Sequence, residues 1–283
     1  MKTLLIDAGN SHLKWATLSD EDSLSEQTSA SHQYELPIEV YEKIVTSNND
    51  SQTVIMVSVL GGTFSRAAEK IALEQQMKFI EVASVNELSS IKNGYADPTK
   101  LGTDRFVGII SAYHLHNNST NGNRACIVVD SGTATTIDAV DKNGQHLGGV
   151  ILPGLHLCSE SLLENTELLG LWGNESHEFT PECFSKETTQ AIASGCLLGH
   201  AGAIEHICNM MEQQLIKQSQ LTSKNDPEND TTQTQQDKLE IKRVICGGAA
   251  ESLLPYMESE YDLQPDLLMY GLKVIKEDLA RNV

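Results

Sequence analysis

Two strand, turn, strand segments that lie far apart in the chain constrain its fold more than any other feature. In the first segment, the apolar run TLLID ends at Asp7, Gly9 follows in a turn, and a second apolar run begins at residue 12. In the second segment, CIVVD ends at Asp130, Gly132 follows, and ATTIDAV continues the chain. Apolar runs of this length predict strands, and the glycines predict tight turns between them. The repeated pattern predicts two duplicated lobes.

The chain between these segments alternates strands with helices. TVIMVSVL at 53–60 and KFIEVA at 78–83 are typical of buried strands, while 64–77 carries apolar residues at helical spacing. This alternation predicts an α/β protein.

Polar runs predict where the lobes divide. Residues 117–124 are polar and rich in turn residues, so we expect an N-terminal lobe at 1–120 and a C-terminal lobe at 121–283. The stretch at 218–238 holds one aliphatic residue and buries too little apolar surface to order itself, so it predicts a flexible surface insertion.

Composition narrows the class of partner. The formal charge of -19 argues against nucleic acid, which clustered Lys and Arg would bind, and is accounted for by solubility. No apolar run approaches the length of a membrane span, so we expect no membrane partner. The 6 cysteines are widely spaced without a Cys-x-x-Cys pair, which predicts reduced thiols in a cytoplasmic protein.

The repeated Asp-x-Gly turns suggest a chemistry. Glycine allows a tight turn that brings backbone N–H groups close to phosphate oxygens, and aspartate can hold a hydrated Mg²⁺. A single copy is better explained as a hairpin turn capped by aspartate. Two copies, each ending a buried strand, favour nucleotide binding. The sequence offers no P-loop, no G-x-G-x-x-G and no H-R-D loop as another phosphate site.

Two further groups of residues are candidates for chemistry. Asp104 and Arg105 precede the apolar helical run FVGIISAYHL. Asp104 is either a helix cap or a carboxylate that accepts the proton of an alcohol during phosphoryl transfer, with Arg105 holding the acceptor. Cys196 and His200 stand four residues apart on an expected helix, where they are either two metal ligands or packing residues, and packing is the simpler account.

Five motifs occur together in order along the chain. They are Asp-Ala-Gly-Asn-Ser at 7–11, Leu-Gly-Thr-Asp-Arg at 101–105, Asp-Ser-Gly-Thr-Ala-Thr-Thr-Ile-Asp at 130–138, Gly-Gly-Val-Ile-Leu-Pro-Gly at 148–154 and Gly-Gly-Ala-Ala-Glu at 247–251. This combination resembles the type III pantothenate kinases, also called Bvg accessory factor homologues, from residue 4 to about residue 254.

The resemblance implies a fold and a reaction. The fold is that of the acetate and sugar kinase, Hsc70 and actin superfamily: two actin-like ATPase (ribonuclease H-like) lobes with a nucleotide cleft between them. The reaction is transfer of the γ-phosphoryl group of ATP to pantothenate, which gives 4'-phosphopantothenate in the first step of coenzyme A biosynthesis. The implied cofactors are Mg²⁺ and a monovalent cation, K⁺ or NH₄⁺, and the implied assembly is a homodimer.

The resemblance also assigns roles to individual residues. The ATP phosphates are expected at Asp7, Ala8, Gly9, Asn10, Ser11, His12, Leu13, Lys14 and Thr133. Pantothenate is expected at Tyr95, Gly102, Thr103, Asp104 and Arg105, with Thr188 reaching the site of the partner subunit. Asp104 matches the proton acceptor, and Asp130 matches the ligand of the monovalent cation.

Some features depart from the family pattern, and two other functions remain open. Residues 166–170 replace a Thr-Ala-x-Leu-Pro segment that is frequent in the family, and the polar insertion is unusual. One rival is a kinase or phosphohydrolase of the same fold that acts on a sugar or polyphosphate, against which the segment at 101–105 speaks. The other is a regulatory protein that kept the fold, against which the intact aspartates speak.

Overall fold

The chain folds into two compact units, each built on a five-stranded sheet. The computed structural model describes residues 2–117, 124–164, 179–224 and 239–281. Unit 1 comprises Met1–Gly122, Gly144–Gly148 and Asp266–Val283, and unit 2 comprises Asn123–Asn143 and Gly149–Pro265. The units therefore differ from the expected ranges 1–120 and 121–283, because the C-terminal helix packs within the first unit.

Unit 1 has a mixed sheet in the order β3-β2-β1-β4-β5. Its strands and helices are β1 (Thr3–Ala8), β2 (His12–Leu18), β3 (Thr28–Ser31), α1 (Pro37–Ser47), β4 (Thr53–Ser58), α2 (Gly62–Glu74), β5 (Lys78–Glu81), β6 (Glu87–Leu88), β7 (Ile91–Lys92), the short 3₁₀ helix η1 (Pro98–Lys100), α3 (Thr103–Asn117) and α7 (Leu267–Arg281). Strand β2 runs antiparallel to β1, whereas β4 runs parallel to β1 and to β5.

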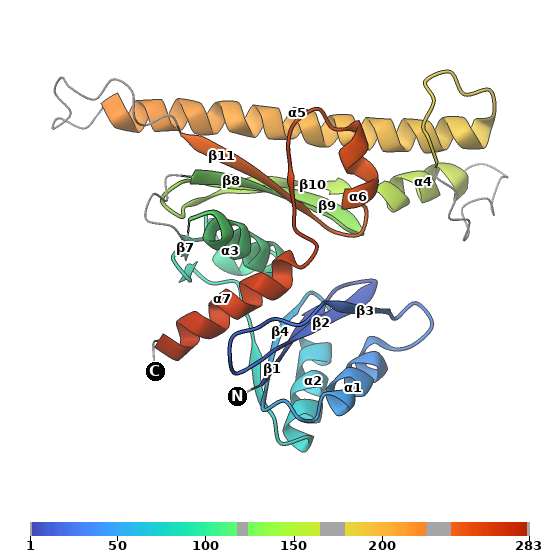
Figure 1. Ribbon diagram of the computed structural model, residues 1–283. Helices are drawn as coiled ribbons and strands as arrows, with labels where there is room; N and C mark the ends of the chain where they lie inside the picture. Colours follow the sequence, from blue (N-terminus) through green and yellow to red (C-terminus); the bar gives the residue numbers. More distant parts are fainter. Residues whose placement is uncertain (1, 118–123, 165–178, 225–238, 282–283) are drawn as a thin grey trace. The chain divides into compact units, whose positions relative to one another are not determined.

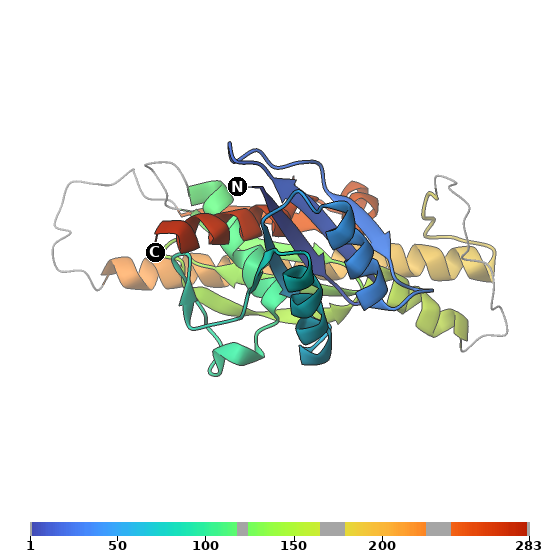
Figure 2. The ribbon, with the colours of Figure 1, turned by 90° about the horizontal axis from the view of Figure 1, so that it is seen from below.

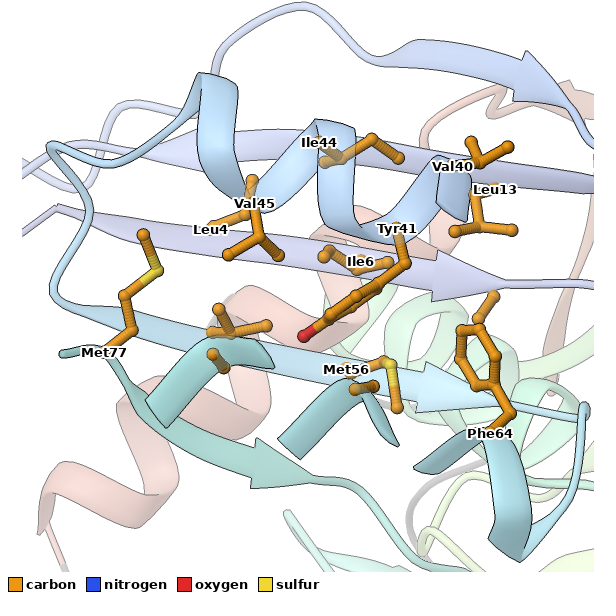
Figure 3. Close-up of a cluster of buried hydrophobic side chains, with 14 residues drawn as sticks. Leu4, Ile6, Leu13, Val40, Tyr41, Ile44, Val45, Met56, Phe64 and Met77 are labelled. Carbon is orange, nitrogen blue, oxygen red and sulfur yellow. The ribbon is translucent and has the colours of Figure 1, made fainter. Parts of the chain in front are cut away.

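Strand alternation divides the core of unit 1 between two faces of its sheet. Leu4 and Ile6 of β1 pack with Tyr41 of α1 and Phe64 of α2, as Figure 3 shows. Figure 2 shows α1 and α2 side by side on this face. Helices α3 and α7 cover the other face (Figure 1). They can pack closely because Gly271 of α7 has no Cβ, which would lie 2.7 Å from the carbonyl oxygen of Val107 in α3.

Unit 2 repeats the architecture of unit 1. Its elements are β8 (Arg124–Ser131), β9 (Ala134–Val140), β10 (His146–Pro153), α4 (Leu155–Glu164), α5 (Thr188–Lys224), β11 (Glu240–Cys246), α6 (Ala250–Leu253), η2 (Leu254–Tyr256) and β12 (Asp262–Leu263). The sheet order is β10-β9-β8-β11-β12, with β9 antiparallel to β8 and with β11 parallel to β8 and β12. This order matches that of unit 1 strand for strand, which confirms the predicted duplication.

The 37-residue helix α5 lies along one face of the second sheet (Figure 1). Its apolar side packs on the strands through residues such as Leu197 and Ile204, opposite Ile127 and Val129 of β8. Residues 218–224, expected within a flexible insertion, continue this helix, while 225–238 lie outside the described residues. In the part of the chain that the structure describes, no helix is long and apolar enough to span a membrane.

A buried ion-pair network fastens α5 to the sheet. Arg243 of β11 donates one Nη to Glu205 at 3.0 Å and the other to Asn209 at 2.7 Å, and it also pairs with Glu212. Tyr261 donates its hydroxyl to Glu205 at 3.1 Å. A buried arginine is tolerated because these partners on α5 satisfy its donors and its charge.

Candidate functional site

The first Asp-x-Gly turn joins β1 to β2 and is tightly closed. Asp7, with 8% exposure, lies one residue before the end of β1 and is paired in register with Lys14 of β2. The N–H of Gly9 donates to the carbonyl oxygen of His12 at 3.1 Å, and a Cβ on Gly9 would lie 3.2 Å from the same oxygen. Asn10 and Ser11 at the tip are exposed, so the turn presents its backbone to solvent.

A histidine that the sequence did not suggest supports this turn. His32, directly after β3, contacts the carbonyl oxygen of Gly9 through its ring Nε2 at 3.0 Å. Its backbone N–H donates to the carbonyl oxygen of Ser11 at 3.2 Å. Partial burial, and then the positive charges of Lys14 and His32, lower the pKa of His12. Basic side chains and open backbone amides together favour an anion such as a phosphate.

Asp104 lies in the first turn of α3, in space that Gly102 leaves free. The helix begins at Thr103, so Asp104 is its second residue. The N–H of Arg105 donates to Asp104 Oδ1 at 2.8 Å. A Cβ at position 102 would lie 2.7 Å from that oxygen, so a larger residue there would displace this carboxylate.

Arg105, Tyr95 and His146 form one contact group in unit 1. Arg105 Nη1 donates to the Tyr95 hydroxyl at 2.9 Å, and its guanidinium lies over the Tyr95 ring at 5.6 Å. The ring of His146, with 1% exposure, stacks on Tyr95 with centroids 5.9 Å apart. The N–H of Gly94 also donates to His146 Nδ1 at 3.4 Å. The structure thus brings Tyr95 and Arg105, two of the residues assigned to pantothenate by resemblance, into contact.

In the second Asp-x-Gly turn, three separate glycine motifs meet. Gly132 closes the turn by donating its N–H to Ala134 at 3.0 Å. Gly154 donates to the carbonyl oxygen of Thr133 at 3.1 Å, and Ala249 donates to that of Ser131 at 3.0 Å. The motifs at 130–138, 148–154 and 247–251 are therefore parts of one backbone cluster.

No side chain larger than hydrogen fits at two of these glycines. A Cβ on Gly154 would lie 2.4 Å from the carbonyl oxygens of Gly132 and Thr133. A Cβ on Gly247 would lie 2.4 Å from the oxygen of Ser131 and 2.7 Å from Asp130 Oδ1, and the φ of Gly247 is +94°. The backbone of Gly247 thus packs directly against the Asp130 carboxylate.

A buried chain of hydrogen bonds leads from this turn to α5. Ser131 Oγ lies 3.1 Å from Thr135 Oγ1, which lies 2.9 Å from His200 Nε2. Burial lowers the pKa of His200, which has 6% exposure, so its ring is neutral at neutral pH. Among the described residues, no group of three or more His, Cys, Asp or Glu could hold a metal ion.

The remaining predicted positions lie on α5 and in the second turn. Thr188 is the first residue of α5 in unit 2 and is exposed, whereas Tyr95 and Arg105 belong to unit 1. Thr133 is exposed at the tip of the second turn, and Asp130 is partly buried at the end of β8. The departure at 166–170 lies outside the described residues.

Two sheets of identical order, each with an Asp-x-Gly turn after its first strand, define an actin-like ATPase. A crystal structure from Campylobacter jejuni, described as a Baf family transcriptional activator, shares the fold with a TM-score of 0.56 and 19% identity, over 99% of this chain and 100% of that one. Residues 3–210 match the family described as type III pantothenate kinase. The chain belongs to the type III pantothenate kinase family.

Curated relatives agree over nearly their whole length. A type III pantothenate kinase of Janthinobacterium sp. (strain Marseille) is 31% identical over 280 residues, which cover 96% of each chain. That of Aromatoleum aromaticum is 32% identical over 280 residues, which cover 98% of this chain and 99% of the relative. The predicted family, fold class and kinase activity are confirmed.

The contact between Gly247 and Asp130 generates a prediction. We expect Gly247→Ala to displace the Asp130 carboxylate and the Ser131 carbonyl, and to lower both the thermal stability and the kinase activity. The stability loss should be about 2–4 kcal/mol, from overpacking plus strain at a positive φ. Thermal unfolding and a coupled assay of ADP release measure the two effects.

Gly148→Ala is the matched control, because Gly148 has a φ of +104° but no atom lies within 4 Å of an added Cβ. It should suffer the backbone strain alone, of about 1 kcal/mol. Equal losses of thermal stability and of kinase activity in Gly247→Ala and Gly148→Ala would show that the contact between Gly247 and Asp130 does not matter for either property.

Proposed function

We propose that this pantothenate kinase works by positioning and electrostatics, with Asp104 as the proton acceptor for the primary hydroxyl of pantothenate. Phosphoryl transfer to an alcohol needs a carboxylate that orients the hydroxyl and takes its proton as the bond to phosphorus forms. The observation that carries this proposal is the space that Gly102 leaves beside the Asp104 carboxylate. Asp104 also lies at the N-terminus of α3, where the helix dipole favours its ionised form.

Tyr95 and Arg105 are assigned to pantothenate, together with Gly102 and Thr103. The contact of Arg105 with the hydroxyl and ring of Tyr95 supports this assignment, since it fixes a cation one residue from Asp104. A fixed guanidinium suits the carboxylate of pantothenate, which it can bind through two parallel hydrogen bonds. The position of Tyr95 is in turn supported by stacking on His146.

The ATP phosphates are assigned to both Asp-x-Gly turns. The first turn, from Asp7 to Lys14, offers exposed amides at its tip and basic groups at its base. The second turn offers the exposed Thr133. Backbone amides and lysine are suited to phosphate oxygens even in a chain whose net charge is -19, because only the local potential acts on the ligand. The nucleotide cleft between the lobes stays a prediction.

Asp130 is assigned to a monovalent cation, K⁺ or NH₄⁺. A Cβ on Gly247 would lie 2.4 Å from the carbonyl oxygen of Ser131 and 2.7 Å from Asp130 Oδ1, so two oxygen atoms suited to a cation lie close together there. Such a cation would supply positive charge beside the phosphates. Mg²⁺ would be held mainly by phosphate oxygens and water, as is usual for nucleotide enzymes.

A homodimer and a cytoplasmic location complete the proposal. Thr188, Ala191, Gly195, Gly199 and Gly202 are exposed along α5, and the three glycines have open space around them. Small exposed residues let a second copy of a helix approach closely, which supports pairing through α5 with Thr188 reaching the partner's pantothenate. All 6 cysteines are free, which suits a reducing compartment.

The role of Asp104 is tested by Asp104→Asn. This change removes the proton acceptor but keeps the side-chain shape, so kcat should fall by about 10² or more while ATP affinity stays nearly unchanged. Steady-state kinetics and calorimetric ATP binding measure these two quantities. Asp97→Asn is the control, since Asp97 is an exposed turn aspartate nearby. Near-normal turnover of Asp104→Asn would show that the carboxylate is only structural.

The cation assignment predicts a salt dependence of the rate. With ionic strength held constant, activity should be higher in potassium or ammonium chloride than in sodium chloride, because the site is assigned to the larger ions. Asp130→Asn should abolish this preference, whereas Asp141→Asn in the turn after β9 should keep it. Equal wild-type rates in the three salts would remove Asp130 from the cation site without affecting the kinase assignment.

The shared site predicts complementation between two inactive variants. Thr188→Arg would place a bulky charge in both pantothenate sites of a two-fold dimer, and should raise the KM for pantothenate at least about tenfold. In a mixed dimer with Asp104→Asn, one site carries both lesions and the other carries neither. Activity should therefore return when the two variants exchange subunits.

Thr46→Arg, on the exposed side of α1, is the matched control for the added charge. It should retain activity alone. Verified subunit exchange without recovery of activity, or a wild type that sediments as an active monomer, would refute the shared site.

A further inference from the structure

We infer that His200 is a positioning residue for the second Asp-x-Gly turn, holding Ser131 through Thr135. The inference rests on the assignment of ATP and a monovalent cation to that turn. His200 lies on α5, outside every motif of the family pattern, and its interaction with the turn is made through side chains alone.

Strand alternation explains why these three side chains meet. Ile127 and Val129 of β8 face α5, so Ser131, two residues further, faces α5 as well. Thr135 of β9 is the cross-strand partner of Ser131 and points to the same side. Leu197 and Ile204 place the corresponding side of α5 on the sheet, and His200 lies between them. The hydrogen-bonded side chains of Ser131, Thr135 and His200 thus lie at one end of the otherwise apolar interface between α5 and the sheet.

Burial makes each link of this chain matter. Ser131 and Thr135 have 0% exposure, so solvent does not replace a lost partner. With a neutral imidazole, Nε2 either accepts the Thr135 proton or donates its own, and the hydroxyls order themselves accordingly. Removing His200 therefore leaves the Thr135 hydroxyl, and with it that of Ser131, without a fixed orientation.

The turn is held from two sides, and His200 supplies one of them. The Ser131 carbonyl oxygen accepts from Ala249, and Gly247 packs on Asp130. These contacts fix the backbone, whereas the Thr135–His200 chain fixes the Ser131 side chain. Asp130 and Thr133, on either side of the Ser131–Gly132 pair, are the groups assigned to the cation and to phosphate. A shift of Ser131 would misplace both of them.

The test compares His200→Phe with His200→Gln. Phenylalanine keeps a ring against the sheet but has no nitrogen, so the KM for ATP should rise by roughly tenfold and the potassium concentration for half-activation should rise with it. The KM for pantothenate should change less than about twofold. The amide nitrogen of glutamine can reach the place of Nε2, so His200→Gln should restore most of the ATP affinity. Calorimetry of ATP binding gives a readout independent of turnover.

A double variant separates positioning from stability. His200→Phe with Thr135→Val replaces two of the three buried partners by apolar groups, so the double variant should be more thermally stable than Thr135→Val alone, in which both His200 and Ser131 lose this contact. Ser131 still lacks its side-chain partner there, so the KM for ATP should stay high. His114→Phe is the matched control, because it removes a contact of 2.7 Å between Nε2 and the carbonyl oxygen of Ser89 in unit 1. It measures how much stability is lost when any hydrogen-bonded histidine is replaced by phenylalanine.

The outcomes are distinct. ATP affinity that recovers together with stability in the double variant, or that is unchanged in His200→Phe, would overturn the inference. If His200→Phe does not fold, Thr135→Val and the double variant decide the same question. A wild type that binds ATP but does not phosphorylate pantothenate would refute the proposed function, while the ATP affinities would still test His200.

Discussion

The close packing of peptide groups around the second Asp-x-Gly turn is the constraint on which the candidate site depends. Backbone from three distant parts of the chain meets at Ser131 and Thr133, and hydrogen bonds from Gly154 and Ala249 join them. Peptide groups approach this closely only where side chains are absent, so the glycines are required by geometry. The strands of one sheet bring these segments together, so the turn can form only with this order of strands. The close contacts in the turn likewise fit no other order.

The two turns reach a similar shape with different supports. The first is closed by its own backbone and by His32, which directly follows β3, with basic groups around it. The second is closed by glycine contacts and a neutral hydrogen-bond chain to α5. A duplicated fold thus carries one turn suited to contacting anions directly and another that holds a carboxylate in a tight cradle.

Much of this arrangement was predictable because it is local. Apolar runs predicted β1, β2, β8 and β9, and the motif at 101–105 predicted the start of α3. The histidines were not predictable, because His32, His146 and His200 each act through a contact with a distant segment that no spacing reveals. The length of α5 was also missed, since its polar end is favoured as helix by continuation from a packed segment rather than by its composition.

The placement of α7 has a consequence for how the protein is made. Unit 2 lies entirely between Asn123 and Pro265, whereas unit 1 needs residues from both ends of the chain and from 144–148. During synthesis from the N-terminus, unit 2 is therefore complete before unit 1, although unit 1 begins first. Until α7 is made, the parts of the first sheet and of α3 on which it packs remain uncovered. The helix that carries Asp104 therefore gains its packing partner α7 only after all of unit 2 has been made.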